Sequence, residues 1–173
     1  MTDTEQRDAT TPATEQRGPR WVSLLVFVLV TTLAGFVGSL LQGDDVGSRY
    51  LALDLPAWAP PQDAFGIVWP ILYVLIGIAA WRTWSVAGGV RPAALALGLW
   101  AAQLVVNASW SGVFFGLEAV AAAIAVIVVL DVLVVALIAA TWRHDRLAAG
   151  MLVPYLLWIL YATALNIAIY ALN

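Results

Sequence analysis

Residues 21–41, WVSLLVFVLVTTLAGFVGSLL, form an apolar stretch of 21 residues without a charged side chain. About 20 apolar residues cross a bilayer as a helix, in which every backbone polar group is satisfied internally. A signal peptide is the alternative, but the stretch is too long for its apolar region and no A-x-A cleavage pattern follows. The stretch therefore predicts a membrane-spanning helix.

The composition of the whole chain supports the same environment. Of its 173 residues 62% are hydrophobic and 11% are charged, whereas a soluble domain has about 25% charged residues. A chain of this length cannot hide so much apolar surface in a water-soluble globule. The absence of cysteine excludes disulfides and thiolate chemistry. The net charge of −3 and the lack of lysine argue against nucleic acid as a partner.

Four further apolar stretches follow, and together they predict an all-α integral membrane protein, a five-transmembrane-helix bundle. The predicted spans are residues 21–41, 65–84, 92–116, 119–142 and 147–172. Residues 1–20 are polar and mixed in charge, which predicts a disordered cytosolic tail before a single domain at residues 21–173. The third and fourth spans are separated by only a few residues, which predicts a tight helical hairpin.

Arginine positions predict the orientation of the five spans. The tail, the second loop and the fourth loop would share one face, and that face has seven arginines: Arg7, Arg17, Arg20, Arg82, Arg91, Arg143 and Arg146. The other face has only Arg49. Because positive loops stay inside, we expect a cytosolic N-terminus and a C-terminus on the opposite side.

The first loop, residues 42–64, is long, polar and rich in proline. Pro56, Pro60 and Pro61 fix φ and restrict the residues before them, so the loop is expected to be stiff. Pro70 is expected in the first turns of the second helix, where a missing N–H is tolerated. We therefore interpret this loop as a lid over one end of the bundle, the alternative being a structured cap without ligand contact.

Three helix faces combine aromatic with polar residues inside the spans. The spacing places on common faces Trp69 and Tyr73; Asn107, Trp110, Ser111 and Phe114; and Tyr155, Trp158, Ala162 and Asn166. Polar side chains of this kind face the interior of a membrane bundle. The faces predict an aromatic-lined cavity for a flat, largely apolar ligand, and ordinary interhelical packing is the alternative for any one residue.

The sequence contains no conventional set of catalytic residues. Asp131 is the one acid in the middle of a span, so it is a functional candidate or a hydrogen-bonded structural group. One histidine, His144, does not predict a metal site. Ala94, Gly98 and Ala102 repeat every four residues, a spacing that lets two helices approach closely, either within the bundle or in a homodimer.

Three segments resemble the tryptophan-rich sensory protein family, TspO/MBR. They are LPAWAPPQDAFGIVWPILYVLIG at residues 55–77, QLVVNASWSGVFFGLE at 103–118 and PYLLWILYATALNIAIYALN at 154–173. The resemblance covers residues 21–173. It implies a five-helix bundle, often dimeric, whose ligand cavity is closed by the first loop.

The resemblance also implies what the cavity holds. Members of this family bind porphyrins, including protoporphyrin IX and haem, so we expect an integral membrane tetrapyrrole-binding sensory or regulatory protein that needs no cofactor. The alternatives are light-dependent degradation of protoporphyrin, in which Trp69 and Trp158 would take part, and transport of porphyrins or sterols. The ligand-binding residues implied by the motifs and the helix faces are Tyr50, Trp69, Asn107, Trp110, Ser111, Phe114, Trp158 and Ala162. After Tyr170 the chain has no basic residue, which argues against sterol contact at this end.

Overall fold

The computed structural model describes residues 20–173. The predicted tail at residues 1–20 therefore lies outside the described residues, except for Arg20, which is the first residue of helix α1. Every long element is a helix, and residues 20–173 contain no strand. The predicted all-α fold class is confirmed.

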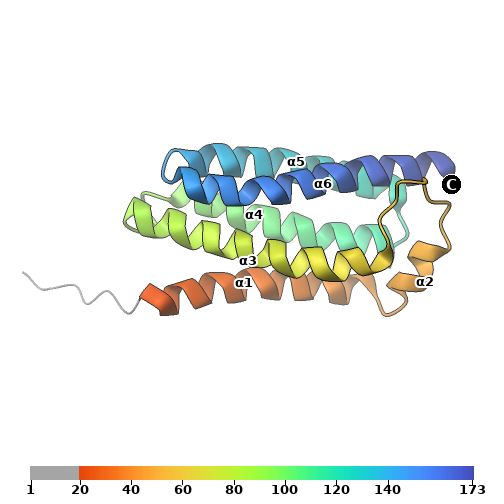
Figure 1. The fold of residues 1–173 in the computed structure, drawn as a ribbon, viewed down its shortest axis with the longest axis horizontal. Coiled ribbons are helices and arrows are strands. Elements are labelled where there is room, and N and C mark those ends of the chain that lie inside the picture. The colour runs from red at the N-terminus through yellow and green to blue at the C-terminus, as the bar shows by residue number, and fades with distance from the viewer. Residues whose placement is uncertain (1–19) are drawn as a thin grey trace, which may run out of the picture.

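Five of the helices are long and apolar enough to cross a membrane. They are α1 (Arg20–Gln42), α3 (Gln62–Ala87), α4 (Ala94–Ser111) with its π-helical continuation η1 (Gly112–Gly116), α5 (Val120–Trp142) and α6 (Arg146–Leu172). A short helix, α2 (Val46–Leu51), lies between α1 and α3. The long helices run side by side, and α2 lies at the same end as the C-terminus (Figure 1).

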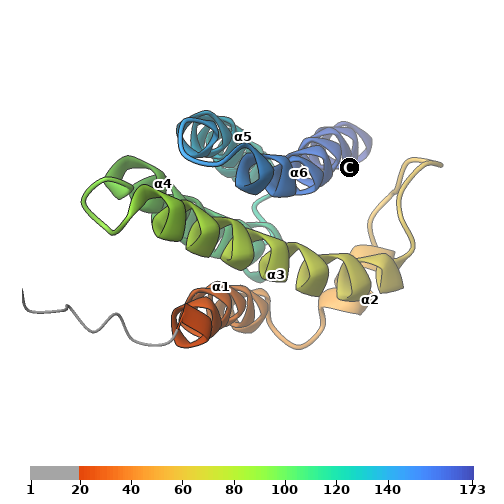
Figure 2. The same ribbon diagram turned by 60° about the vertical axis from the view of Figure 1, so that its left-hand side comes forward.

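The long helices pack in three layers (Figure 2). Helices α3 and α4 form the middle layer, with α1 on one side and the α5–α6 pair on the other. Helix α1 packs on both α3 and α4, while α6 packs on α3 and α5 packs on α4. Large apolar side chains such as Leu25 and Leu29 of α1 remain exposed, which is expected of a surface that faces lipid.

Glycines bring α1 close to its neighbours. A Cβ placed on Gly77 would lie 2.8 Å from the Cα atom of Val28 in α1. A Cβ on Gly38 would lie 3.3 Å from the Cα atom of Ala108 in α4. Small residues permit such close backbone approach where lipid tails offer no hydrophobic drive for helix association. These contacts fix the position of α1 on the middle layer.

The lid differs in two respects from the sequence expectation. The expected loop at residues 42–64 contains the helix α2, and α3 begins at Gln62 instead of Phe65. Pro70 is consequently inside α3, in its third turn, and the expectation that it lies in the first turns is wrong. Because proline has no N–H, Pro70 cannot donate a backbone hydrogen bond to the carbonyl of Gly66 four residues earlier. Pro61, with ψ of 146°, directly precedes the helix and marks its actual start.

Candidate functional site

A cavity of about 590 Å³ lies at the lid end of the bundle. It is bordered by α1, α2, the first turns of α3 and the junction of α4 with η1, and it is not fully closed. Its wall consists of Gly35, Ser39, Gln42, Val46, Tyr50, Gln62, Asp63, Phe65, Gly66, Ile67, Trp69, Pro70, Tyr73, Trp110, Ser111 and Phe115. The volume is in the range of small-molecule sites, about 300–1,000 Å³.

Aromatic rings dominate the cavity wall. Trp69 stacks on Tyr73 with 5.3 Å between ring centroids and an interplanar angle of 25°. Trp110 lies with its ring centroid 6.2 Å from that of Phe115, edge to face. Offset-stacked and edge-to-face pairs are the favoured arrangements of such rings. The wall therefore presents preformed aromatic surfaces to a flat ligand.

Buried hydrogen bonds hold the ring of Tyr73 in place. Its hydroxyl donates to Asn107 Oδ1 at 2.8 Å, and Asn107 Nδ2 donates to the Tyr155 hydroxyl at 3.2 Å. The Tyr155 hydroxyl in turn donates to Gln103 Oε1 at 2.8 Å. On the other side of the ring, a Cβ on Gly35 would collide with Tyr73. The ring is thus confined by α4 and α6 through polar contacts and by α1 through close packing.

Trp110 is fixed in a comparable way. Its indole Nε1 donates to Asn166 Oδ1 at 3.2 Å, and Asn166 Nδ2 donates to the carbonyl of Val120 at 3.2 Å. Trp110 also stacks on Phe114 with 5.3 Å between ring centroids. Because a buried indole N–H requires an acceptor, the asparagine both satisfies and orients the ring.

The polar part of the wall carries no cation. Ser39, Gln42, Gln62 and Ser111 supply hydroxyl and amide groups, and Asp63 supplies a carboxylate. No histidine, cysteine or methionine is among the lining residues. The wall thus lacks the most frequent axial ligands of haem iron, although phenolic oxygens are present.

The lid, residues 42–64, is held by one hydrogen bond within itself and by contacts with two residues of the C-terminal segment. The Tyr50 hydroxyl donates to the carbonyl of Pro60 at 3.1 Å, within the lid itself. The Tyr161 hydroxyl of α6 donates to the carbonyl of Trp58 at 2.8 Å. Asn173 accepts from the Asp54 amide at 3.0 Å and donates to its carbonyl at 3.2 Å. Burial raises the pKa of Tyr50, with a further contribution from Tyr161, so this hydroxyl remains a donor at neutral pH.

The structure brings four of the eight predicted ligand-binding residues into the cavity wall: Tyr50, Trp69, Trp110 and Ser111. The other four lie elsewhere. Asn107 is buried behind Tyr73, and Phe114 and Ala162 line a neighbouring void of about 20 Å³, which is too small for a ligand. Trp158 packs against Phe65, 5.8 Å between centroids, on the α6 side of α3.

These differences have a common cause. Helix spacing shows that residues share a face, but it does not show which neighbouring helix that face meets. The α6 face with Tyr155, Ala162 and Asn166 packs into the protein core, whereas α1 and not α6 forms part of the cavity wall. The α1 residues Gly35, Ser39 and Gln42 were not among the predicted site residues. Their signal is the small and polar residues, four and three apart, that interrupt an otherwise apolar helix.

The remaining candidates lie away from the cavity. Asp131 accepts a hydrogen bond from Thr163 at 2.8 Å between α5 and α6, and its Oδ1 atom is buried without a partner. His144 lies in the turn between α5 and α6. Residues 20–173 contain no group of three or more histidine, cysteine, aspartate or glutamate side chains that could hold a metal ion.

Fold and site together define a multi-pass integral membrane protein with a lidded, aromatic, ligand-sized cavity at one end of a helical bundle. The chain belongs to the TspO/MBR family, whose sequence model matches residues 27–172. The resemblance seen in the three sequence segments is thereby confirmed.

Named relatives from bacteria, archaea and animals are similar over nearly their whole lengths. Protein CrtK of Rhodobacter capsulatus is 36% identical over 148 residues, 86% of this chain and 91% of the relative. Tryptophan-rich protein TspO of Archaeoglobus fulgidus is 36% identical over 152 residues, 88% of this chain and 97% of the relative. The human translocator protein is 33% identical over 156 residues, 90% of this chain and 92% of the relative.

Proposed function

We propose that this protein is a membrane receptor for a tetrapyrrole, with protoporphyrin IX or haem as ligand, in a sensory or regulatory role. The observation that carries this proposal is the lidded cavity of about 590 Å³ with Trp69, Tyr73 and Trp110 in its wall. A flat macrocycle gains from stacking on such rings and from burial of its apolar faces. A relative from Cereibacter sphaeroides, 36% identical, is named tryptophan-rich sensory protein, and this name supports the sensory role.

The charge of the cavity favours one orientation of this ligand. Asp63 is the only carboxylate in the wall, and no lining residue is an arginine or lysine. Carboxylate substituents of a tetrapyrrole would be repelled by Asp63 and would therefore point away from the first turn of α3, where this residue lies. Because the wall has no histidine, cysteine or methionine, the metal-free porphyrin suits it better than haem.

Ligand titration tests the proposal. The purified full-length protein is titrated with protoporphyrin IX, and binding is followed by porphyrin absorbance. Trp69→Leu should weaken binding about tenfold, which is the loss expected of one stacked ring. Trp142→Leu is the matched control, because Trp142 is exposed at the other end of the bundle. Equal affinity of wild type and Trp69→Leu would contradict the proposal.

A second candidate function is light-dependent breakdown of protoporphyrin. The position of Trp69 in the cavity wall favours it, because an indole beside a photoexcited porphyrin can donate an electron. Trp158 does not line this cavity, so Trp69→Phe should slow porphyrin loss under illumination more than Trp158→Phe. Equal rates in wild type and Trp69→Phe would exclude an electron-donating role for Trp69.

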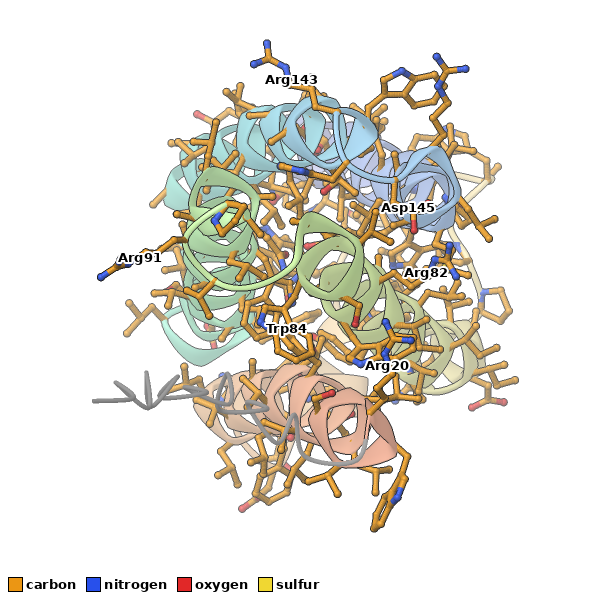
Figure 3. The ribbon with its side chains drawn as sticks, turned by 90° about the vertical axis from the view of Figure 1, so that its left-hand side faces the viewer. Arg20, Arg82, Trp84, Arg91, Arg143 and Asp145 are labelled. Carbon is orange, nitrogen blue, oxygen red and sulfur yellow. The ribbon has the colours of Figure 1, made fainter. Side chains whose placement is uncertain are left out.

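The charge distribution supports a cytosolic N-terminus. Arg20, Arg82, Arg91 and Arg143 lie together at the end opposite the lid (Figure 3). Arg49 lies in α2 at the lid end. By the positive-inside rule the lid and C-terminus face away from the cytosol. Because the chain has no cysteine, a single cysteine introduced at Ala57 or His144 would report the side by labelling of intact cells with an impermeant maleimide. Labelling of the cysteine at position 144 and not of the one at position 57 would show the opposite orientation.

The homodimer is proposed through α4. Ala94, Gly98 and Ala102 are all exposed along one face of this helix, and a Cβ on Gly98 would meet nothing within 4 Å. Such a face allows a second helix to approach closely. Gly98→Cys should form a disulfide-linked dimer in native membranes, whereas Leu157→Cys, exposed on α6, should not. A dimer that forms equally with both variants would argue against α4.

A further inference from the structure

A second cavity, of about 340 Å³, lies beside the first at the lid end. It is formed by α2, η1 and the first residue of α5, and Phe115 contributes to the walls of both cavities. Its wall consists of Arg49, Ala52, Leu53, Phe114, Phe115, Glu118 and Val120. The wall thus combines apolar groups with one ion pair, Arg49 and Glu118, whereas the charged group in the wall of the first cavity is the carboxylate of Asp63.

Arg49 is exceptional in its electrostatic surroundings. The described residues at the lid end include five acids, Asp44, Asp45, Asp54, Asp63 and Glu118. Arg49 is the one cation there within residues 20–173. Its Nη1 atom donates to the carbonyl of Phe115 and lies 3.4 Å from Glu118 Oε1. A guanidinium has five N–H donors, so others remain available to a ligand in the cavity.

The pair of Arg49 with Glu118 is easily replaced. The Glu118 side chain is 72% exposed, and exposed ion pairs contribute little to stability because water screens them. An incoming carboxylate or phosphate that is partly shielded from water by the phenylalanine rings would compete well for the guanidinium. Glu118 then serves as an internal competitor that occupies Arg49 when no ligand is bound.

The backbone beside Arg49 is unusual in two ways. Residues Gly112–Gly116 form a π-helical turn, and such turns are frequent at functional sites. Glu118 has a φ of 55°, a left-handed conformation that glycine adopts without strain. The chain has a glutamate here although glycine would fit more easily, and strained residues of this kind cluster at ligand sites.

We propose that this second cavity binds a single-chain amphiphile with an anionic headgroup, a carboxylate or a phosphate. Arg49 would pair with the headgroup, and Phe114, Phe115 and Leu53 would contact the first part of the acyl chain. The cavity begins at Val120, the first residue of the spanning helix α5, which places it at the level where lipid headgroups meet the hydrocarbon. This site does not depend on which ligand occupies the larger cavity.

Quenching by a brominated fatty acid tests the proposal. The full-length protein in phosphatidylcholine nanodiscs is titrated with 9,10-dibromostearate, and tryptophan fluorescence is recorded. Trp110 is suited to report binding, because its ring lies 5.3 Å from that of Phe114 and 6.2 Å from that of Phe115. The methyl ester of the same acid tests the need for charge, and it should bind at least about tenfold more weakly, since hydrogen bonds to charged groups contribute about 1.5–3 kcal/mol.

Two variants should shift the affinity in opposite directions. Arg49→Gln should weaken binding of the acid by about tenfold or more and leave the ester unchanged. Glu118→Gln should strengthen binding of the acid about two- to fivefold, because the internal competitor is lost. Arg143→Gln, at the other end of the bundle, is the control for general surface charge and should bind as wild type does.

Competition distinguishes the sources of the anion. Lysophosphatidate should displace the brominated acid, whereas inorganic phosphate should not at millimolar concentration. Displacement by inorganic phosphate alone would overturn the amphiphile as ligand. Equal affinities for acid and ester, or unchanged affinity in both Arg49→Gln and Glu118→Gln, would overturn the site itself. Glu118→Gln keeps the proposal testable even where Arg49→Gln does not fold.

Discussion

Gly77 shows how much one missing side chain matters in this fold. In Gly77→Ala the added Cβ would lie 2.8 Å from Val28 Cα and 3.1 Å from its backbone nitrogen. Backbone atoms cannot rotate away, so α1 would have to move off α3. We expect a loss of about 1–3 kcal/mol in the free energy of unfolding, the usual range for overpacking. Denaturant unfolding of the detergent-solubilised protein measures it.

The control for this substitution is Gly150→Ala in α6. A Cβ there would meet nothing within 4 Å, and alanine is a better helix former than glycine by up to about 1 kcal/mol. Gly150→Ala should therefore be neutral or stabilising. Equal losses of unfolding free energy in the two variants would contradict the role of Gly77 in the close packing of α1 on α3.

Asn107 and Tyr73 form a second test at the residue scale. Asn107→Leu would leave the buried Tyr73 hydroxyl without its acceptor, and we expect a loss of about 1–3 kcal/mol in unfolding free energy. Tyr73→Phe in the same chain should recover part of that loss, because the Tyr73 hydroxyl is then absent, while the Tyr155 hydroxyl still lacks the bond from Asn107 and keeps its bond to Gln103. A double-mutant cycle by chemical unfolding measures this coupling. Strictly additive losses would show that the hydrogen bond does not couple the two residues.

The sequence patterns singled out some residues that line the cavity and others that do not. Trp69 and Trp110 stand out as indoles inside spans, and both lie in the cavity wall. Trp158 has the same signature but packs on Phe65 instead, because a spacing of 3.6 residues per turn carries no information about the neighbouring helix. Asn107 positions Tyr73 without lining the cavity. Its side chain accepts a hydrogen bond from α3 and donates one to α6. No single stretch of sequence shows that these three helices meet at this residue.

At the scale of elements, hydropathy predicted the long helices and missed the details of the lid. The polar composition of residues 42–64 predicts a loop, but Val46–Leu51 form a helix within this segment. Pro70 was expected near the first turns of a helix that begins at residue 65, whereas α3 begins at Gln62 and has Pro70 in its third turn. Apolar helices tolerate an internal proline in a membrane because neighbouring groups satisfy the freed carbonyl. Element boundaries therefore needed the structure.

Asp145 connects two elements and offers a graded test. Its carboxylate accepts from the amides of Leu147 and Ala148 at 2.9 and 3.2 Å, which caps α6, and its Oδ2 atom lies 2.7 Å from Arg82 Nη2 of α3 (Figure 3). Asp145→Asn keeps the capping oxygen and removes the ion pair, so we expect a loss of about 1 kcal/mol in unfolding free energy. Asp145→Ala removes both, and we expect a further loss of about 0.5–2 kcal/mol.

Salt separates the two contributions of Asp145. The stability difference between wild type and Asp145→Asn should shrink in high salt, because screening weakens the ion pair. The difference between Asp145→Asn and Asp145→Ala should not change, since capping is a local hydrogen bond. If asparagine and alanine were equally destabilising, the capping role of Asp145 would have to be abandoned.

At the scale of the whole molecule, the fold places the lid, both cavities and the C-terminus at one end (Figure 1). Composition and span length were sufficient to predict five spanning helices, because the bilayer allows few alternatives. They could not predict that α1 forms one wall of the first cavity, since that depends on which helices α1 contacts through Gly38 and Gly77. The largest unpredicted feature is thus the relative placement of helices.

Hydrogen bonds from Tyr161 and Asn173 hold the lid against the C-terminal end of the bundle, and removing them tests what keeps the lid in place. Tyr161→Phe combined with Asn173→Ala removes the bonds from α6 to Trp58 and Asp54. With about 0.5–1 kcal/mol for each of the three hydrogen bonds, the lid should open roughly 10- to 150-fold more often. Amide hydrogen exchange of residues 52–59 should accelerate accordingly, and a ligand of the first cavity should dissociate faster. Tyr170→Phe is the matched control, since Tyr170 is exposed on the same helix. Exchange at the wild-type rate in the double variant would show that the prolines alone keep the lid closed, without any anchoring by α6.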